Sequence, residues 1–238
     1  SSEGPESLTS LMKLLMSRAF FVLGDNRIAS VYYFQAMDDL NEISAREFYR
    51  DNIDIILDKE KSEYERCRTV DQKKAFFRKF WKSRDPSPTT EYNERLVEHY
   101  RRLNYSKQHF YIRQTKGYDD RGRIYIKHGE PDQKISLNGN WAIRDNETWL
   151  YSKNRSQPLL YNFVARNNVY RMVYRLEEAL VPDIQTEINM GGSNIVALFR
   201  SRGEIHPKYD QLANELSNFQ GNIEQARHGS LMDLFAEE

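Results

Sequence analysis

The sequence is poor in the features that usually reveal a chemistry. It has one cysteine, Cys67, among its 238 residues, which excludes an internal disulfide and a cysteine-cluster metal site. Lys and Arg (35) balance Asp and Glu (35), which argues against binding nucleic acid or an anionic membrane through bulk charge. No segment approaches the ~20 apolar residues of a membrane span. Phosphate-loop, zincin and nucleophile-elbow motifs are also missing, so those enzyme classes have no support.

The chain is instead rich in aromatic residues, and its first half has helical periodicity. The 15 tyrosines and 12 phenylalanines should supply much of the core volume. Apolar residues recur at three- and four-residue spacing over 8–22 and 28–40, with a Gly24-Asp25-Asn26 break between them, which predicts an α-hairpin. Ser44 with Glu47, and Thr69 with Gln72, are typical of capping boxes that begin further helices. A long helix is predicted from Thr90 to about Phe110.

The pattern changes after residue 115. Arg121-Gly122 leads into a short strand, which the alternating side chains over 123–127 predict and which Gly129 and Pro131 would end. Residues 137–140 are predicted to be a loop, and residues 147–151 a second strand. Residues 159–164 and 169–176 are predicted to pair as a hairpin around Asn167-Asn168, because asparagine tolerates positive φ.

The last part of the chain is harder to interpret. Gly191-Gly192-Ser193 indicates a flexible break, residues 195–199 suit a short strand or a helix start, and 207–219 suit a helix. The apolar residues 231–235 are typical either of a docking segment or of a last helix. We therefore predict an α+β protein with three regions: a helical region 1–114 packed on a small antiparallel sheet in 115–180, and a helical or extended extension 181–238.

Two motifs carry a family resemblance. The first is a Phe-Trp-x-x-Arg-Asp-Pro-x-Pro run, and the second is Arg-Gly-x-Ile-Tyr-Ile followed by a Gly-x-Pro-Asp turn. With these motifs, over about residues 48–174, the chain resembles the GWxTD-domain family of bacterial proteins. The matching residues are Phe80, Trp81, Arg84, Asp85, Pro86 and Pro88, then Arg121, Gly122, Ile124, Tyr125 and Ile126, then Gly129, Pro131 and Asp132.

The name-giving motif is degenerate in this member. Gly117 is kept, Tyr118 replaces the tryptophan, Asp119-Asp120 follows with one residue fewer, and the threonine is missing. The resemblance implies an exported protein of a Gram-negative-type envelope, so we expect a periplasmic or envelope location, with the cytoplasm as an alternative. The chain begins at Ser1, and we expect any signal peptide or lipid anchor to have been lost.

The sharpest site hypothesis lies at the turns around the predicted strand. Carboxylates near a histidine suit a metal ion or acid–base catalysis, and Asp120, His128 and Asp132 are close in sequence. An extended strand would nevertheless hold Asp120 and His128 ~26 Å apart. The competing interpretation is that acid–arginine pairs brace the backbone, and we prefer it. The residues concerned are Asp119, Asp120, Arg121, Arg123, His128, Glu130 and Asp132.

Outside this segment, Arg84 is a candidate anion-binding residue, but we prefer the interpretation that it pairs with a carboxylate. Asp85 is expected to cap the next segment. Trp81, Tyr118 and Trp149 suit either a binding groove or the core. His99 and His109 are ten residues apart, so we do not interpret them as a ligand pair.

From these observations we expect a non-enzymatic interaction or scaffold module of a larger envelope assembly. It would have protein partners and no nucleic acid, cofactor or metal, and it would meet the membrane only through a partner or a lost anchor. The alternative is a hydrolase that acts on envelope glycan or peptide at residues 117–132.

Overall fold

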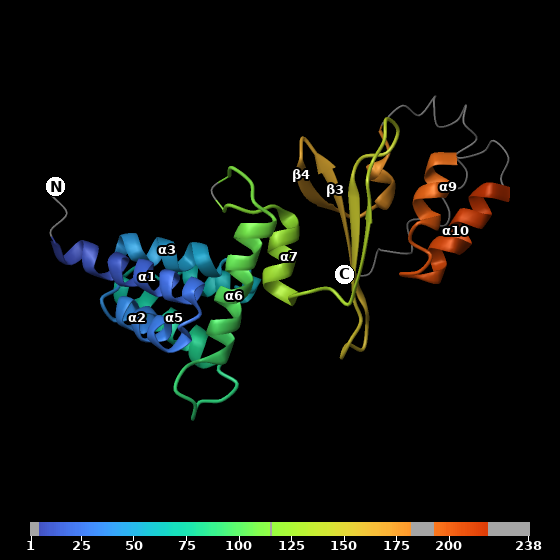
Figure 1. Ribbon diagram of the computed structural model, residues 1–238. Coiled ribbons are helices and arrows are strands. Elements are labelled where there is room, and N and C mark those ends of the chain that lie inside the picture. Colours follow the sequence, from blue (N-terminus) through green and yellow to red (C-terminus); the bar gives the residue numbers. More distant parts are fainter. Residues whose placement is uncertain (1–4, 115, 182–192, 219–238) are drawn as a thin grey trace. The chain divides into compact units, whose positions relative to one another are not determined.

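The computed structural model describes residues 5–114, 116–181 and 193–218 (Figure 1). The chain divides into two compact units. The helical unit comprises residues 1–118 and 122–129, and the sheet unit comprises residues 119–121 and 130–238. The predicted α+β class is confirmed, with a helical first half and one antiparallel sheet. Among the described residues, no helix is both long and apolar enough to cross a bilayer.

The helical unit begins with an α-hairpin and continues through further short helices (Figure 1). Asp25 caps the second helix, since its carboxylate accepts the Ile28 N–H at 3.0 Å. The predicted Thr69–Gln72 capping box is also confirmed. The helices are α1 (Pro5–Leu23), α2 (Asn26–Asp38), α3 (Glu42–Asn52), α4 (Asp58–Glu65), α5 (Val70–Lys82), α6 (Glu94–His109) and α7 (Asp120–His128).

Two helix starts were predicted wrongly. Helix α3 is capped by Asn41, and Ser44 lies inside its first turn as the reciprocal partner of the capping box. Helix α6 begins at Glu94 with Asn93 as its cap, not at Thr90. In both cases an asparagine nearby supplies a side-chain oxygen to the first free backbone N–H groups, and serine or threonine was the wrong choice among several possible caps.

The core of the helical unit is built around Tyr33. Its ring makes edge contacts with Phe48, Trp81 and Tyr100, at centroid distances of 4.9, 6.1 and 5.6 Å. Trp81 is fully buried and donates its indole N–H to the Tyr33 hydroxyl at 2.7 Å. The aromatic residues therefore do fill this core, and Trp81 is part of it rather than of a binding groove.

The largest error of the sequence-based prediction concerns residues 123–127, which lie in helix α7 and not in a strand. Gly122, Ile124, Tyr125 and Ile126 are all buried in it. A Cβ at position 122 would lie 2.8 Å from the Tyr118 side chain, so glycine permits this close approach. Tyr125 stacks on Tyr105 of α6 at 4.3 Å, which holds α7 beside α6 (Figure 1). Burial on several sides of this short helix produced the alternation that resembled a strand.

Among its described residues, the sheet unit has four antiparallel strands in the order β1-β2-β3-β4. Asn167 and Asn168 have φ values of 53° and 61°, so the predicted asparagine hairpin turn between β3 and β4 is confirmed. The strand β1 was not predicted, and it extends into the expected loop at 137–140. The strands are β1 (Gln133–Leu137), β2 (Asn146–Tyr151), β3 (Leu159–Arg166) and β4 (Val169–Val173).

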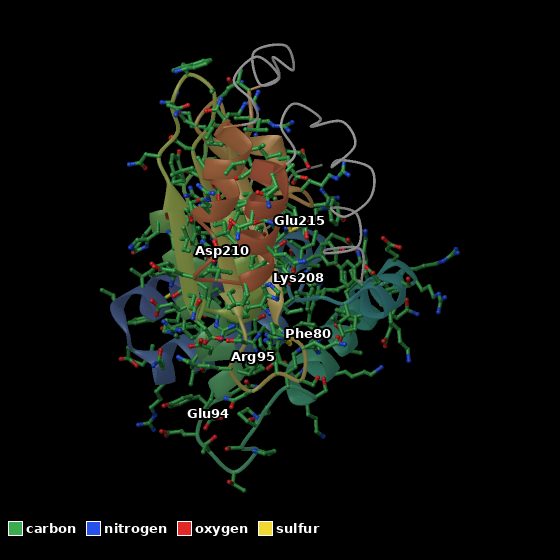
Figure 2. All side chains as sticks on the ribbon, turned by 90° about the vertical axis from the view of Figure 1, so that its right-hand side faces the viewer. Phe80, Glu94, Arg95, Lys208, Asp210 and Glu215 are labelled. Carbon is green, nitrogen blue, oxygen red and sulfur yellow. The ribbon has the colours of Figure 1, made fainter. Side chains whose placement is uncertain are left out.

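Strand β2 is buried along its whole length. One face of the sheet shares an apolar core with η1 (Leu176–Ala179), α9 (Ser193–Arg200) and α10 (Pro207–Asn218), and residues 195–199 are thus helical. Figure 2 labels Lys208, Asp210 and Glu215 along α10, whose other side buries Tyr209 and Leu212. The expected break at 191–192 and the apolar tail at 231–235 lie outside the described residues.

Beneath α9 and α10 the sheet also holds a buried cation. Arg202 is fully buried and donates to the Thr148 hydroxyl at 2.8 Å and to the Asn146 side-chain oxygen. Burial lowers the pKa of Arg202 to about 10. Neutral oxygens thus satisfy this arginine, and Asn162 continues the polar layer by accepting from Thr148 at 2.8 Å.

Candidate functional site

The sequence-predicted cluster is brought together only in part, and its centre is Arg121. The Arg121 guanidinium pairs with Asp119 at 2.8 Å and with Glu147 of β2 at 2.8 Å, and it lies 3.6 Å from the centroid of the Tyr170 ring. Both carboxylates are buried. Burial opposes the charge of Arg121, but hydrogen bonds and the charges of Asp119 and Glu147 raise its pKa above the ordinary value. Lys134 also pairs with Glu147, at 3.0 Å, so two cations balance the two buried carboxylates.

The two adjacent aspartates at the start of α7 bind backbone. Asp119 accepts the Arg121 N–H at 3.0 Å, and its other oxygen accepts the Tyr170 N–H at 3.3 Å. Asp120 accepts the Met172 N–H at 2.9 Å. Tyr170 and Met172 belong to β4, an edge strand of the sheet. The carboxylates therefore occupy N–H groups that an exposed edge would otherwise offer to another chain.

Trp149 and Asp132 also have structural partners. Trp149 is buried, packs against Phe163 at 4.9 Å and donates its indole N–H to Glu147 at 2.8 Å. Asp132 accepts the N–H groups of Ser152 and Lys153 at 2.6 and 2.7 Å. Those two backbone hydrogen bonds lower the pKa of Asp132 below its usual range. Asp132 therefore fixes the turn that follows β2.

The proposed metal set does not assemble in the part of the chain that the structure describes. No group of three or more His, Cys, Asp or Glu side chains there is arranged to hold a metal ion. The change from strand to helix shortens the rise between Asp120 and His128 to about 12 Å, because a helix rises ~1.5 Å per residue. Arg123 and His128 lie farther along α7, and Glu130 is exposed beyond its end.

Tyr118, which stands where the family has tryptophan, is held in the helical unit. Its hydroxyl donates to the buried Asp54 carboxylate at 2.6 Å, and Lys116 pairs with the other oxygen at 2.8 Å. Burial and the neighbouring Asp54 charge raise the pKa of Tyr118 well above its usual value. The substitution therefore exchanges an indole for a phenol that completes a buried carboxylate site.

The Arg84–Asp85 motif forms a second charged group. Arg84 pairs with Glu60 at 2.7 Å, and its guanidinium lies 3.8 Å from the centroid of the Phe80 ring. Asp85 accepts the Ser87 N–H at 3.1 Å and so shapes the proline turn; the cap of α6 is Asn93. The expected carboxylate partner of Arg84 is thus present. Arg84 offers no free charge to an anion.

Arg95 lies in the same region of the helical unit (Figure 2). Within the described part of the chain, its buried Nη1 atom has no hydrogen-bond partner. Burial, together with the nearby Arg102 and Arg84 guanidinium groups, lowers the pKa of Arg95, while Glu98 acts in the opposite direction.

Sequence reasoning missed a buried polar group in the helical core. The Asp51 carboxylate accepts from Arg18 at 2.8 Å and from the Tyr100 hydroxyl at 2.8 Å. The Asp51 carbonyl oxygen contacts His99 Nε2 at 2.9 Å. Burial lowers the pKa of His99 to about 4, although the Asp51 charge opposes this shift. His99 is therefore neutral at pH 7, and its tautomer carries the proton on Nε2.

The sequence did not show which face of α1 is buried. The apolar periodicity over 8–22 includes Leu14, Leu15, Ala19 and Val22, of which only Leu14 is buried. Six residues form an exposed apolar surface on α1, which we call the α1 stripe. Its five large side chains are 40–77% exposed. The α1 stripe consists of Met12, Leu15, Met16, Ala19, Val22 and Leu23.

The α1 stripe continues onto the second helix of the hairpin. Ile28 and Val31 of α2 are 39% and 50% exposed, and Tyr32 of α2 stacks on Phe20 of α1 at 5.7 Å. Single exposed apolar residues are ordinary on protein surfaces, whereas a contiguous patch marks an interaction site. The sequence did contain a signal for this surface. Apolar residues occupy two faces of α1, and because one face is enough to pack the helix, the second remains exposed.

The chain belongs to the GWxTD domain family, whose model matches residues 30–180. The match begins inside α2, upstream of the expected limit near residue 48, and ends after η1. No curated protein and no experimentally solved structure matches the chain. Helix α1, which carries the stripe, lies before the matched residues.

Proposed function

We propose that this chain is a non-enzymatic interaction module, or scaffold, within a larger assembly of the bacterial envelope. The observation that carries the proposal is the α1 stripe. Covering it would remove several half-exposed apolar side chains from water, at roughly 25 cal/mol for each Å² that becomes buried. A partner that covers this surface would therefore gain binding free energy from the burial of apolar area.

The charged residues of the central segment support the same proposal. Arg121 and Lys134 balance the charges of Asp119 and Glu147, and Asp120 and Asp132 accept backbone N–H groups. A general acid or base needs a proton that it can exchange with a substrate. These groups are instead committed to contacts that fix the start of α7 and the edges of the sheet. The hydrolase alternative gains no support from their geometry.

Affinity isolation of the tagged full-length chain from its native envelope tests the proposal. Leu23, the most exposed large residue of the α1 stripe, is 77% exposed, so Leu23→Glu should leave the fold intact. Leu57→Glu is the matched control, because Leu57 is 65% exposed and lies outside the stripe. We expect partners to co-purify with the unmodified chain and the control but not with Leu23→Glu. An unmodified chain that is recovered alone and monomeric would overturn the proposal.

A further inference from the structure

Five of the six residues of the α1 stripe have the same spacing in both directions around Ala19; the sixth, Met12, has the polar Asn26 at the equivalent position. Leu15 and Met16 precede Ala19 by four and three residues, and Val22 and Leu23 follow it by three and four. Residues at these spacings share one helix face, and the exposure of all five shows that this face is open. The pattern therefore places a small residue at the centre, with two large side chains on each side.

We propose that the α1 stripe binds the α1 stripe of a second copy of this chain, as an antiparallel pair with its two-fold axis at Ala19. This inference rests on the proposed function, because it names the partner of the same surface. The two-fold axis exchanges the two ends of the pattern, as in any isologous interface. Leu15 then faces Leu23 of the partner subunit, and Met16 faces Val22 of the partner subunit. Ala19 lets the two backbones approach closely at the crossing.

The charges beside the α1 stripe agree with a second copy. The stripe itself contains no charged side chain. Lys13 and Arg18 flank it, but Lys13 pairs with Asp39 at 2.5 Å and Arg18 pairs with Asp51 at 2.8 Å in the same chain. A pair of α1 stripes therefore buries no uncompensated lysine or arginine of α1. An interfacial membrane helix would instead carry Lys and Arg that are available to lipid headgroups, so a lipid surface is the less favoured occupant.

The area that two α1 stripes could bury indicates which kind of dimer to expect. Two stripes with the adjoining Ile28 and Val31 would bury on the order of 1,000 Å² in total, which is near the lower limit of specific interfaces. We therefore expect a reversible dimer rather than an obligate dimer.

Sedimentation velocity of the full chain, over about 1 to 300 μM, tests this inference. The expected result is a concentration-dependent shift from monomer to dimer. Leu15→Glu and Leu23→Lys should each weaken the dimer at least tenfold. The double variant should recover it, because each introduced Glu faces an introduced Lys of the partner subunit. Leu57→Glu should dimerise like the unmodified chain.

A chain that stays monomeric at every concentration would overturn the inference, and so would a dimer that tolerates both single substitutions. Failure of the double variant to recover would reject the antiparallel register. Stripe-dependent flotation with lipid vesicles in place of dimerisation would assign the surface to a membrane. If the chain is monomeric in sedimentation but Leu23→Glu still prevents partners from co-purifying, only the self-association proposal is rejected. If the chain neither dimerises nor co-purifies with a partner, the proposed function is rejected as well.

Discussion

His99 makes the helical unit sensitive to acid. Its ring is fully buried, and burial lowers its pKa from 6.5 to about 4. Its Nε2 donates to the Asp51 carbonyl, and its buried Nδ1 has no hydrogen-bond partner among the described residues. Protonation would therefore add both a buried charge and an N–H without an acceptor. The unfolded chain takes up this proton more readily than the folded chain.

The sign and size of the effect follow from linkage. Because the folded pKa is the lower one, the stability that a neutral His99 contributes is fully present above pH 6.5 and is lost as the pH falls towards 4. The full shift corresponds to about 3 kcal/mol, at ~1.36 kcal/mol per pKa unit. Between about pH 7.5 and 4.5, most of this amount, roughly 2.5 kcal/mol, should already be lost.

Urea unfolding at several pH values measures this effect. Replacing Trp141 and Trp149 by phenylalanine leaves Trp81 as the only indole, and its ring lies 5.6 Å from that of His99. In this background His99→Gln keeps an N–H donor for the Asp51 carbonyl but cannot titrate. The free energy of unfolding should fall by roughly 2.5 kcal/mol more in the parent than in His99→Gln over this pH range. Equal pH dependence in the two proteins would refute the reasoning.

Three further substitutions test other contacts. Arg121→Gln should destabilise the sheet unit by about 3 kcal/mol in urea unfolding monitored through Trp149, because the buried Asp119 loses its cation and Glu147 keeps only the part-exposed Lys134; a change below ~0.5 kcal/mol would contradict the assigned network. Tyr118→Phe should cost the helical unit about 1–3 kcal/mol in Trp81-monitored unfolding, since Asp54 loses a buried donor; an unchanged midpoint would show that the hydrogen bond is not needed. Asn168→Gly should raise the thermal midpoint by a few degrees or leave it unchanged, because glycine adopts positive φ freely; a marked decrease would exclude the assigned turn.

Local signals in the sequence predicted local structure well. Thr69 with Gln72 identified a helix start, and Asn167-Asn168 identified a hairpin turn, because in both cases the side chains that decide the conformation are neighbours in sequence. The prediction for helix α7 was wrong because its conformation is decided by residues that are distant in sequence. Its conformation depends on the packing of Tyr125 against Tyr105, which the alternation of five residues does not reveal.

In the candidate site, too, contacts between sequence neighbours were predicted and contacts between distant residues were not. The composition of the 117–132 segment indicated acid–arginine pairs, and the Asp119–Arg121 pair exists. Glu147, the second partner of Arg121, is 26 residues away and had no sequence signal. The α1 stripe was missed because the apolar periodicity of α1 fits two faces, and only tertiary packing decides that Leu14 is buried while Leu15 is not.

The central claim is that the α1 stripe is covered in the native protein, and site-specific photo-cross-linking tests it most directly. A photoreactive phenylalanine analogue is introduced at Leu23, or at Leu57 as the control, in the full chain at native abundance. After irradiation of intact cells, position 23 should yield a discrete cross-linked species that position 57 does not. Irradiation that leaves position 23 uncross-linked, or that gives the same products at both positions, would contradict the claim.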